Sequence, residues 1–211
     1  MAIQVIGNGG TVAEVDGTIW RGLRVSPRPP EYGAGGYYRT AISAITAAAP
    51  GAAANLVSLR WTSASLLMLL HSVYISINVS TASTAGLPQF AGYIARAFSA
   101  SDTGGTAVTL TGSAFKLRTN HPTTVMGDMR FASAGTLTAG TRTLDSQPFL
   151  IAQTALALGS TQGAYMDNNA SYDHPITLAQ NEGIVFQNVT ALTAAVYQYT
   201  VHLEWGEIPA F

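Results

Sequence analysis

The stretch Ala195–Ile208, AVYQYTVHLEWGEI, decides the fold class of this chain of 211 residues. Its large apolar side chains fall at every second position, and the positions between them are polar: Gln198, Thr200, His202 and Glu204. Because successive side chains of a strand point to opposite faces, this alternation predicts a long strand with one buried face. We expect that face to consist of Tyr199, Val201, Leu203 and Trp205.

A second alternating stretch, Leu66–Val79 (LLMLLHSVYISINV), lies in the middle of the chain. From Leu69 onward the pattern places Leu69, His71 and Val73 on one apolar face, with His71 as a hydrogen-bonded core residue. The stretch is shorter than the ~18–20 apolar residues that a membrane-spanning helix needs, and it contains polar side chains. We therefore expect a strand, and no membrane contact. The N-terminus lacks the basic and apolar segments of a signal peptide, which predicts a protein made and kept in a cytoplasm, or released from it by lysis.

Shorter runs of strand character fill the rest of the chain from Tyr37 onward, separated by turn signals such as Asp102-Thr103-Gly104-Gly105 and Asn181-Glu182-Gly183. The predicted strands are Leu56–Trp61, Phe90–Ser99, Ala107–Leu110, Phe115–Arg118, Val125–Phe131, Thr136–Thr143, Pro148–Leu158, Ile176–Ala179 and Ile184–Val189. Residues Ala47–Asn55, rich in alanine around Pro50-Gly51, are predicted to be a loop. Many short strands without a strong helix or a repeat indicate an all-β, antiparallel jelly-roll sandwich over residues 37–211.

Residues 1–36 are expected to form an extended N-terminal arm, because closely spaced glycine and proline residues oppose a compact fold there. The arm nevertheless carries apolar and basic side chains that can contact a partner: Ile3, Val5, Ile19, Trp20, Arg21, Arg24 and Arg28. Such a segment can become ordered on a neighbouring protein, for instance by adding a strand to a sheet edge. The alternative is a flexible terminus that binds no partner.

Charge is scarce: only 10% of the residues are Asp, Glu, Lys or Arg, and the formal net charge is −1. A chain of this kind lacks the basic field that drives nucleic-acid binding. Among the ten basic residues only Lys116 is a lysine, and arginine is the residue that protein interfaces favour. The composition indicates a subunit that packs against copies of itself and partners, with a robust neutral domain as the alternative. Because charge-poor jelly rolls commonly close around an axis, we predict a homotrimer.

No catalytic or cofactor motif stands out. Cysteine is absent, which excludes disulfides, thiol nucleophiles and Cys-ligated zinc, and no Gly-x-Ser-x-Gly motif occurs. The four histidines are widely spaced, and Glu204 and Glu207 lie three residues apart on a strand, hence on opposite faces. An Asx-rich loop from Asp167 to Asp173 could hold Ca²⁺, but its spacing is not that of an EF-hand. We predict a protein that is not an enzyme and binds no cofactor or metal.

Several strings resemble segments of virion structural proteins of tailed bacteriophages. They are Phe98–Thr111 (FSASDTGGTAVTLT), Leu137–Pro148 (LTAGTRTLDSQP), Pro175–Asn188 (PITLAQNEGIVFQN) and the strand that ends in Val201–Ile208. The resemblance covers roughly residues 37–208 and rests on strand-and-turn strings, not on a catalytic signature. It implies a jelly-roll subunit that decorates and cements the capsid by binding the major capsid protein, located on the virion surface after synthesis in the bacterial cytoplasm.

Two other functions remain open. One is a tail, baseplate or receptor-binding module, which predicts exposed loop aromatics such as Tyr165 or Tyr172 and binding of glycans. The other is a small enzyme, which lacks any visible pair of nucleophile and base.

Overall fold

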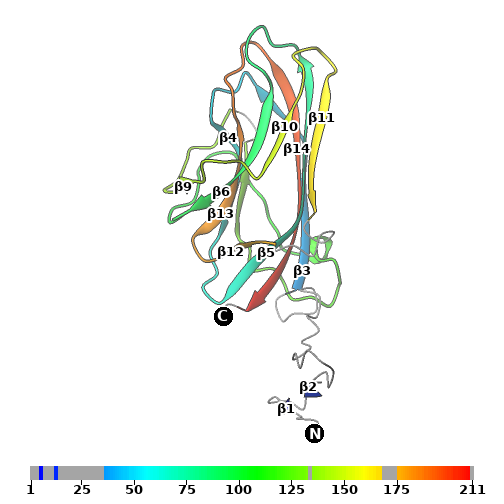
Figure 1. Cartoon of the computed structure of the whole chain (residues 1–211), viewed down its shortest axis with the longest axis vertical. Coiled ribbons are helices and arrows are strands. Elements are labelled where there is room, and N and C mark those ends of the chain that lie inside the picture. Colours follow the sequence, from blue (N-terminus) through cyan, green and yellow to red (C-terminus); the bar gives the residue numbers. More distant parts are fainter. Residues whose placement is uncertain (1–4, 7–11, 14–35, 133–134, 168–174, 210–211) are drawn as a thin grey trace, which may run out of the picture.

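The computed structural model describes residues 5–6, 12–13, 36–132, 135–167 and 175–209. Within them every paired strand is antiparallel, no α-helix occurs, and two sheets pack face to face (Figure 1). One sheet, here called the β5–β14 sheet, has the order β11-β5-β14-β3. Its strands are β3 (Gly36–Ala48), β5 (Leu66–Thr81), β11 (Thr161–Asp167) and β14 (Val196–Pro209), and β12 (Ile176–Leu178) also pairs with β5.

The other sheet, here called the β4–β13 sheet, has the order β10-β6-β13-β4-β8-β7. Its strands are β4 (Ala54–Trp61), β6 (Gln89–Arg96), β7 (Thr106–Ala107), β8 (Asp128–Phe131), β10 (Leu150–Gln153) and β13 (Glu182–Asn188), and β9 (Thr143–Leu144) pairs with β6.

The connectivity is that of a jelly roll. Eight main strands follow one another along the chain as β3, β4, β5, β6, β10, β11, β13 and β14. The first, eighth, third and sixth of these lie side by side in one sheet, and the second, seventh, fourth and fifth lie side by side in the other. Each sheet therefore pairs strands from distant parts of the sequence, as in an eight-stranded double Greek key. The predicted all-β jelly-roll sandwich is confirmed.

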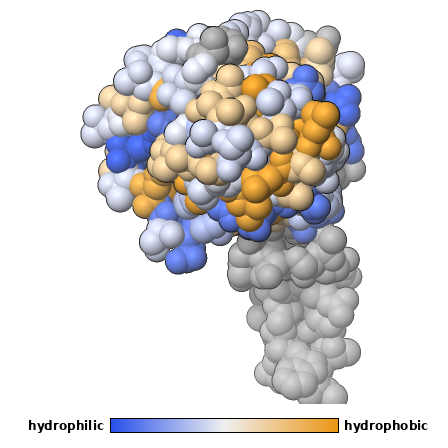
Figure 2. Space-filling view, turned by 90° about the horizontal axis from the view of Figure 1, so that it is seen from above, coloured by the Kyte–Doolittle hydropathy of each residue, from blue (hydrophilic) through white to orange (hydrophobic). Residues whose placement is uncertain are grey.

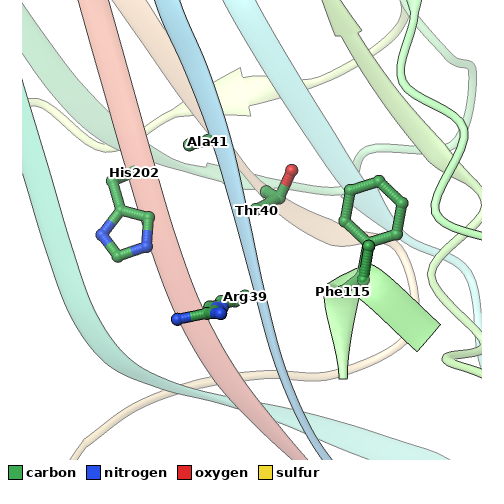
Figure 3. A pocket seen from close by; sticks show the side chains of 6 residues that line it. Arg39, Thr40, Ala41, Phe115 and His202 are labelled. Carbon is green, nitrogen blue, oxygen red and sulfur yellow. The ribbon is translucent and has the colours of Figure 1, made fainter. Parts of the chain in front are cut away.

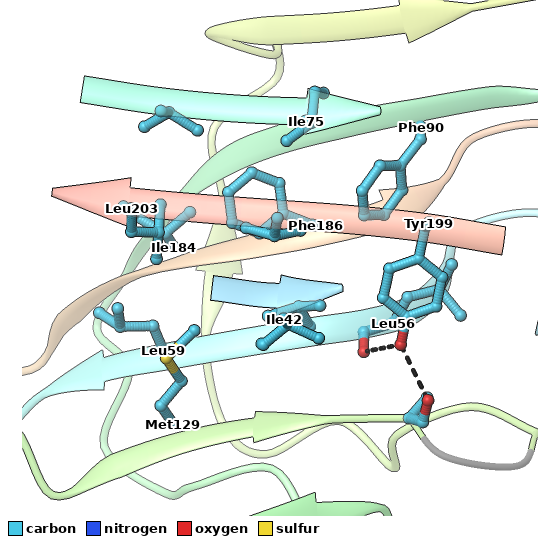
Figure 4. Close-up of a cluster of buried hydrophobic side chains, with 14 of the residues drawn as sticks. Ile42, Leu56, Leu59, Ile75, Phe90, Met129, Ile184, Phe186, Tyr199 and Leu203 are labelled. Carbon is cyan, nitrogen blue, oxygen red and sulfur yellow. Dashed lines mark hydrogen bonds between the residues drawn. The ribbon is translucent and has the colours of Figure 1, made fainter. Parts of the chain in front are cut away.

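The core lies between the sheets. Tyr199, Val201, Leu203 and Trp205 of β14 are fully buried in one core cluster with Leu56, Leu59, Phe90, Ile184 and Phe186 of the opposite sheet. Figure 4 shows Tyr199 and Leu203 among the residues of that sheet. The hydroxyl of Tyr199 donates to the backbone oxygens of Leu56 at 3.2 Å and Ala132 at 2.8 Å, so its polar end is satisfied inside the core. The Phe90 ring lies 5.3 Å from the Tyr199 ring, centroid to centroid. Alternate burial along β14 thus fixes one sheet against the other.

A β-bulge at His71 overturns the face predicted for the start of β5. Trp205 pairs with Leu70 while Glu204 pairs with Ser72, so His71 is an extra residue on β5. An extra residue shifts the two-residue period by one position. Leu70 therefore joins Val73 in the core, and His71 packs edge-on against the Tyr37 ring instead, with ring centroids 4.7 Å apart. The prediction that Leu69 and His71 share the face of Val73 was wrong.

Several strand predictions also need correction. Phe115–Arg118 is not a strand: a 3₁₀ turn spans Ser113–Phe115, and Lys116 makes an isolated bridge to Tyr38. Thr136–Thr143 contributes only a bridge at Thr138 before β9. Two long strands, β3 and β11, were not predicted. The predicted loop Ala47–Asn55 is shorter than expected, because β3 extends to Ala48 and β4 begins at Ala54.

Candidate interaction surfaces

The predicted arm lies mostly outside the described residues, and this holds for Ile3, Ile19, Trp20, Arg21, Arg24 and Arg28. Val5 lies in β1 (Val5–Ile6), which pairs with β2 (Val12–Ala13) and so forms a short hairpin within the arm's own sequence. The expectation that the arm adds a strand to the sheet edge of another protein stays a prediction.

The start of β3, where the arm joins the domain, is held firmly. The backbone N–H of Tyr37 donates to Nδ1 of His121 at 3.0 Å, and its carbonyl accepts from Leu117 N at 3.0 Å. The hydroxyl of Tyr38 donates to the Pro122 oxygen at 3.0 Å, and its ring lies 5.7 Å from the ring of Trp205. These contacts fix the position of Tyr37 and Tyr38 at the start of β3.

A buried carboxyl group lies beside this junction. Glu207 of β14 is fully buried, and it pairs in register with Gly36. It accepts hydrogen bonds from the Thr124 hydroxyl, from Val125 N at 3.3 Å and from Trp205 Nε1 at 3.3 Å. Burial raises the pKa of Glu207, although these three donors partly oppose that shift. Glu204 lies on the opposite, solvent-facing side of the same strand with its side chain partly exposed.

The opposite end of the sandwich carries no charge. Four loops meet there, at residues 49–53, 82–88, 154–160 and 189–195, and none of them contains Asp, Glu, Lys, Arg or His (Figure 1). Their exposed residues are all alanine, threonine or glycine, except for Leu158, which is 70% exposed. Figure 2 looks down on this end, where pale and orange residues predominate and deeper blue gathers toward the edges. We call these four loops the uncharged tip.

Backbone hydrogen bonds connect the loops of the uncharged tip to one another. Thr84 N donates to the Thr193 oxygen at 3.1 Å, and Leu192 N donates to the Pro50 oxygen at 3.0 Å. The buried amide of Asn188 donates to the oxygens of Pro50 and Gly51 at 3.2 and 2.8 Å. Because its exposed residues other than Leu158 are small and its loops are hydrogen-bonded to one another, the tip offers a firm surface that a second protein can approach closely.

Alanines hold several strained positions at this end. Ala49, Ala53 and Ala194 have positive φ angles of 41°, 53° and 57°, which L-residues adopt at a cost of ~1–2 kcal/mol each. Such strain persists where the surrounding contacts determine the conformation. Contacts within the fold therefore fix the backbone conformation of the uncharged tip, and a docking surface needs such a fixed conformation.

Two of the strings that carry the phage resemblance fold against each other. Ser99 N donates to the Thr141 oxygen at 3.0 Å, and Thr103 bridges Thr138. Asp102 accepts from Gly140 N at 2.9 Å and forms a buried ion pair with Arg142, whose guanidinium lies 4.8 Å from the centroid of the Phe98 ring. Burial lowers the pKa of Arg142 to about 10. These contacts join the two strings into one structural unit on the β4–β13 sheet.

The outward face of the β5–β14 sheet carries exposed tyrosines between polar neighbours. Tyr165 of β11 is 60% exposed and lies directly opposite Tyr74 of β5, which is 38% exposed. Tyr165 was predicted to lie in a loop, but it belongs to a strand, because β11 had not been recognised. Tyr172 lies outside the described residues. This face was missed in the sequence, since its residues come from four separate stretches.

A shallow hollow of about 310 Å³ opens at the β3 edge of the same sheet. Arg39, Thr40, Ala41, Ala114, Phe115 and His202 line it. Figure 3 shows Arg39 and His202 on one side of β3 and Phe115 on the other. The hollow therefore straddles the strand edge. The Thr40 hydroxyl is buried and makes no hydrogen bond within the described residues, so it is not coupled to His202 as a nucleophile to a base.

The remaining candidate groups do not come together. No set of three His, Asp or Glu side chains within the described part of the chain is placed to hold a metal ion. Of the Asx-rich loop only Asp167 is described. None of the described helical segments is long and apolar enough to cross a membrane.

Comparison with known proteins does not assign this chain to a family. No family model matches the chain, and no curated protein matches it. A solved structure of the infectious bursal disease virus VP2 subviral particle aligns over 99% of this chain at 14% identity with a TM-score of 0.18, and one of the Gt strain of that virus aligns over 99% at 16% identity with a TM-score of 0.11. This chain spans 47% of each of those two proteins. At these TM-scores neither likeness carries an argument about function.

Proposed function

We propose that this chain is a non-enzymatic structural protein of a tailed-bacteriophage virion, which decorates the capsid and stabilises it by binding the major capsid protein. The observation that carries the proposal is the uncharged tip on a jelly-roll domain. Free proteins keep charge on their surface for solubility, whereas the centres of interfaces are depleted of it. An end without any ionisable side chain is well suited to be covered by another protein. The resemblance of the strings named above to phage virion proteins supplies the phage identity.

A cement protein stabilises a capsid by contacting several capsid subunits at once. A standard protein interface buries about 1,600 Å² in total, and several such contacts per oligomer multiply the avidity. A homotrimer that uses three tips and three arms would connect neighbouring capsid subunits. Its location would be the capsid surface, reached after synthesis in the bacterial cytoplasm.

Co-sedimentation with empty heads assembled from the major capsid protein tests this proposal. The full chain should bind the heads saturably, and Ala52→Glu, which places a charge on the tip, should weaken binding at least about tenfold. Ala107→Glu makes the same change at an exposed alanine of β7, away from the tip, and should bind as the unchanged protein does. Absence of binding by the full chain would contradict the proposal, and equal binding by both variants would remove the tip from it.

A tail, baseplate or receptor-binding module is the second candidate. The exposed pair of Tyr74 and Tyr165 favours it, because exposed aromatic residues on a rigid scaffold are a common element of recognition surfaces.

A further inference from the structure

The outward face of the β5–β14 sheet has features that capsid binding does not require. Its two exposed tyrosines, Tyr74 and Tyr165, are direct cross-strand partners. The Tyr74 ring leans over Gly163, and the Tyr165 side chain extends the other way, toward Asp167 and Ser72, so the two rings form a strip along the sheet. Exposed or half-exposed positions around them carry short polar side chains: Ser76, Asn78, Thr161 and Thr200. The face therefore combines a small aromatic area with many hydroxyl and amide groups.

Gly163 determines how one of these rings lies. A Cβ atom at this position would be 2.9 Å from the Tyr74 hydroxyl oxygen and 3.0 Å from its Cε2 atom, so the ring would have to move to admit a side chain here. The ring of Tyr74 thus lies over the backbone of Gly163. It remains 38% exposed there and is accessible to a ligand above the sheet.

A hydrogen-bonded row of polar groups runs beside the rings. The Ser72 hydroxyl donates to Oε2 of Glu204 at 3.1 Å, and the Tyr37 hydroxyl donates to the same oxygen at 3.5 Å. Nε2 of His202 lies 4.0 Å from the other oxygen, Oε1, which is beyond hydrogen-bond distance. Because an ionised carboxylate has about four acceptor sites, Glu204 is held in place through Oε2 and keeps acceptor capacity on Oε1.

The same row continues to β11. Partial burial and the neighbouring Asp167 carboxylate raise the pKa of Tyr165. Asp167 and Glu204 thus place two carboxylates on this face, and the orientation of Glu204 is fixed by Ser72 and Tyr37. Arg39 of β3 pairs in register with Glu204 and lies near His202 (Figure 3).

We propose that this face binds a neutral glycan, with sugar rings stacked along the strip formed by Tyr74 and Tyr165 and their hydroxyls donating to Glu204 and Asp167. A pyranose ring has an apolar C–H face that suits an aromatic ring, and its hydroxyls form strong charge-assisted hydrogen bonds with carboxylates. Asp167 beside Tyr165 repels an anionic sugar at the rings, whereas Arg39 lies farther away, opposite Glu204, so neutral sugars are favoured over sialic and uronic acids. A protein partner is less suited to the face, since the hot spots of protein interfaces need a large desolvated pocket.

Saturation-transfer NMR on the full chain tests the proposal with maltotriose, cellotriose, chitotriose and mannotriose as neutral probes and sialyllactose as the anionic one. We expect at least one neutral probe to bind with a dissociation constant of about 1 mM or tighter, and sialyllactose not to bind. Tyr165→Ala and Tyr74→Ala should each reduce the affinity at least about tenfold. Tyr93→Ala, at a partly buried tyrosine of β6 in the other sheet, is the matched control and should leave affinity unchanged.

Glu204→Gln provides a second variant that keeps every ring in place, and it should weaken binding at least about threefold by removing the carboxylate charge. Melting curves of each variant verify that it is folded. Absence of saturable binding by all four neutral probes would overturn the proposal, as would preferential binding of sialyllactose or an equal loss of affinity in Tyr93→Ala. The isolated chain is measured, so this result is independent of whether the protein decorates a capsid.

Discussion

Trp205 connects the core to the junction with the arm. The side chain is fully buried, its ring lies 5.7 Å from that of Tyr38 at the start of β3, and its Nε1 donates to Glu207. One residue thus links the last long strand to the first one in the domain. Loss of its ring would leave a cavity between the two sheets.

Trp205→Ala should lower the free energy of unfolding by roughly 3–5 kcal/mol, because the lost apolar contacts and the remaining cavity add together. That amounts to a large part of the stability of a typical domain. Urea denaturation at a fixed protein concentration measures the change. Tyr165→Ala, at an exposed ring, is the control and should change stability by no more than about 0.5 kcal/mol. An unchanged midpoint for Trp205→Ala would mean that Trp205 does not face the core.

Glu207 makes stability depend on pH. Burial raises the pKa of Glu207, so the folded state binds the proton more tightly than the unfolded state does. The unfolded chain loses that proton near pH 4.3. As the pH rises from there through the folded pKa, the free energy of unfolding should fall.

Glu207→Gln removes this titration, so the variant should gain stability relative to the unchanged protein as the pH rises from 4 to 8. Thermal unfolding across this range measures the difference. Glu204→Gln, on the solvent side of the same strand, is the control for the chemical change. A difference between Glu207→Gln and the unchanged protein that does not vary with pH would contradict the burial of an ionisable group at this position.

At the scale of elements, the N-terminal arm is expected to act in docking and to contribute little to folding. Its composition gives it little capacity to form a core, yet it carries apolar residues and the basic Arg21, Arg24 and Arg28, which can pair with carboxylates of a partner. A truncated chain that starts at Tyr37 should fold and oligomerise, but it should bind empty heads markedly more weakly than the full chain. Equal binding of the two forms in co-sedimentation would assign docking to the jelly roll alone.

A strand can be predicted from the sequence when the residues of its two faces differ clearly in polarity. β14 was recognised because bulky apolar and polar residues alternate along its whole length. β3 was not predicted because its sequence, GYYRTAISAITAA, is rich in alanine. Alanine favours helix, and it does not distinguish a buried face of a strand from an exposed one. The bulge at His71 was hidden because Leu69 and Leu70 are both apolar, so a shift by one residue leaves no trace in the pattern.

The candidate surfaces were only partly visible in the sequence for a different reason. Each loop of the uncharged tip can be recognised as free of charge, but only the strand order brings the four loops to one end. Likewise, Tyr74 and Tyr165 become neighbours through the pairing of β5 with β11, which local patterns do not specify. Surfaces built from distant segments follow from topology and register.

For the whole molecule, the scarcity of charge predicts association. We expect a homotrimer, which size-exclusion chromatography with light scattering would detect as three times the 22.0 kDa of the chain. Because few charged side chains are present to repel neighbouring subunits, the trimer should persist at micromolar concentration. A monomeric mass at that concentration would count strongly against the trimer and against a cement that works through multivalency.

The copy number of the chain in purified phage particles tests the central claim most directly. A decoration protein follows the symmetry of the capsid, so quantitative mass spectrometry of the purified particles should find hundreds of copies, in a simple ratio to the major capsid protein. A handful of copies would contradict capsid decoration and assign the chain to the tail or baseplate, and its absence from the particles would contradict any role in the virion.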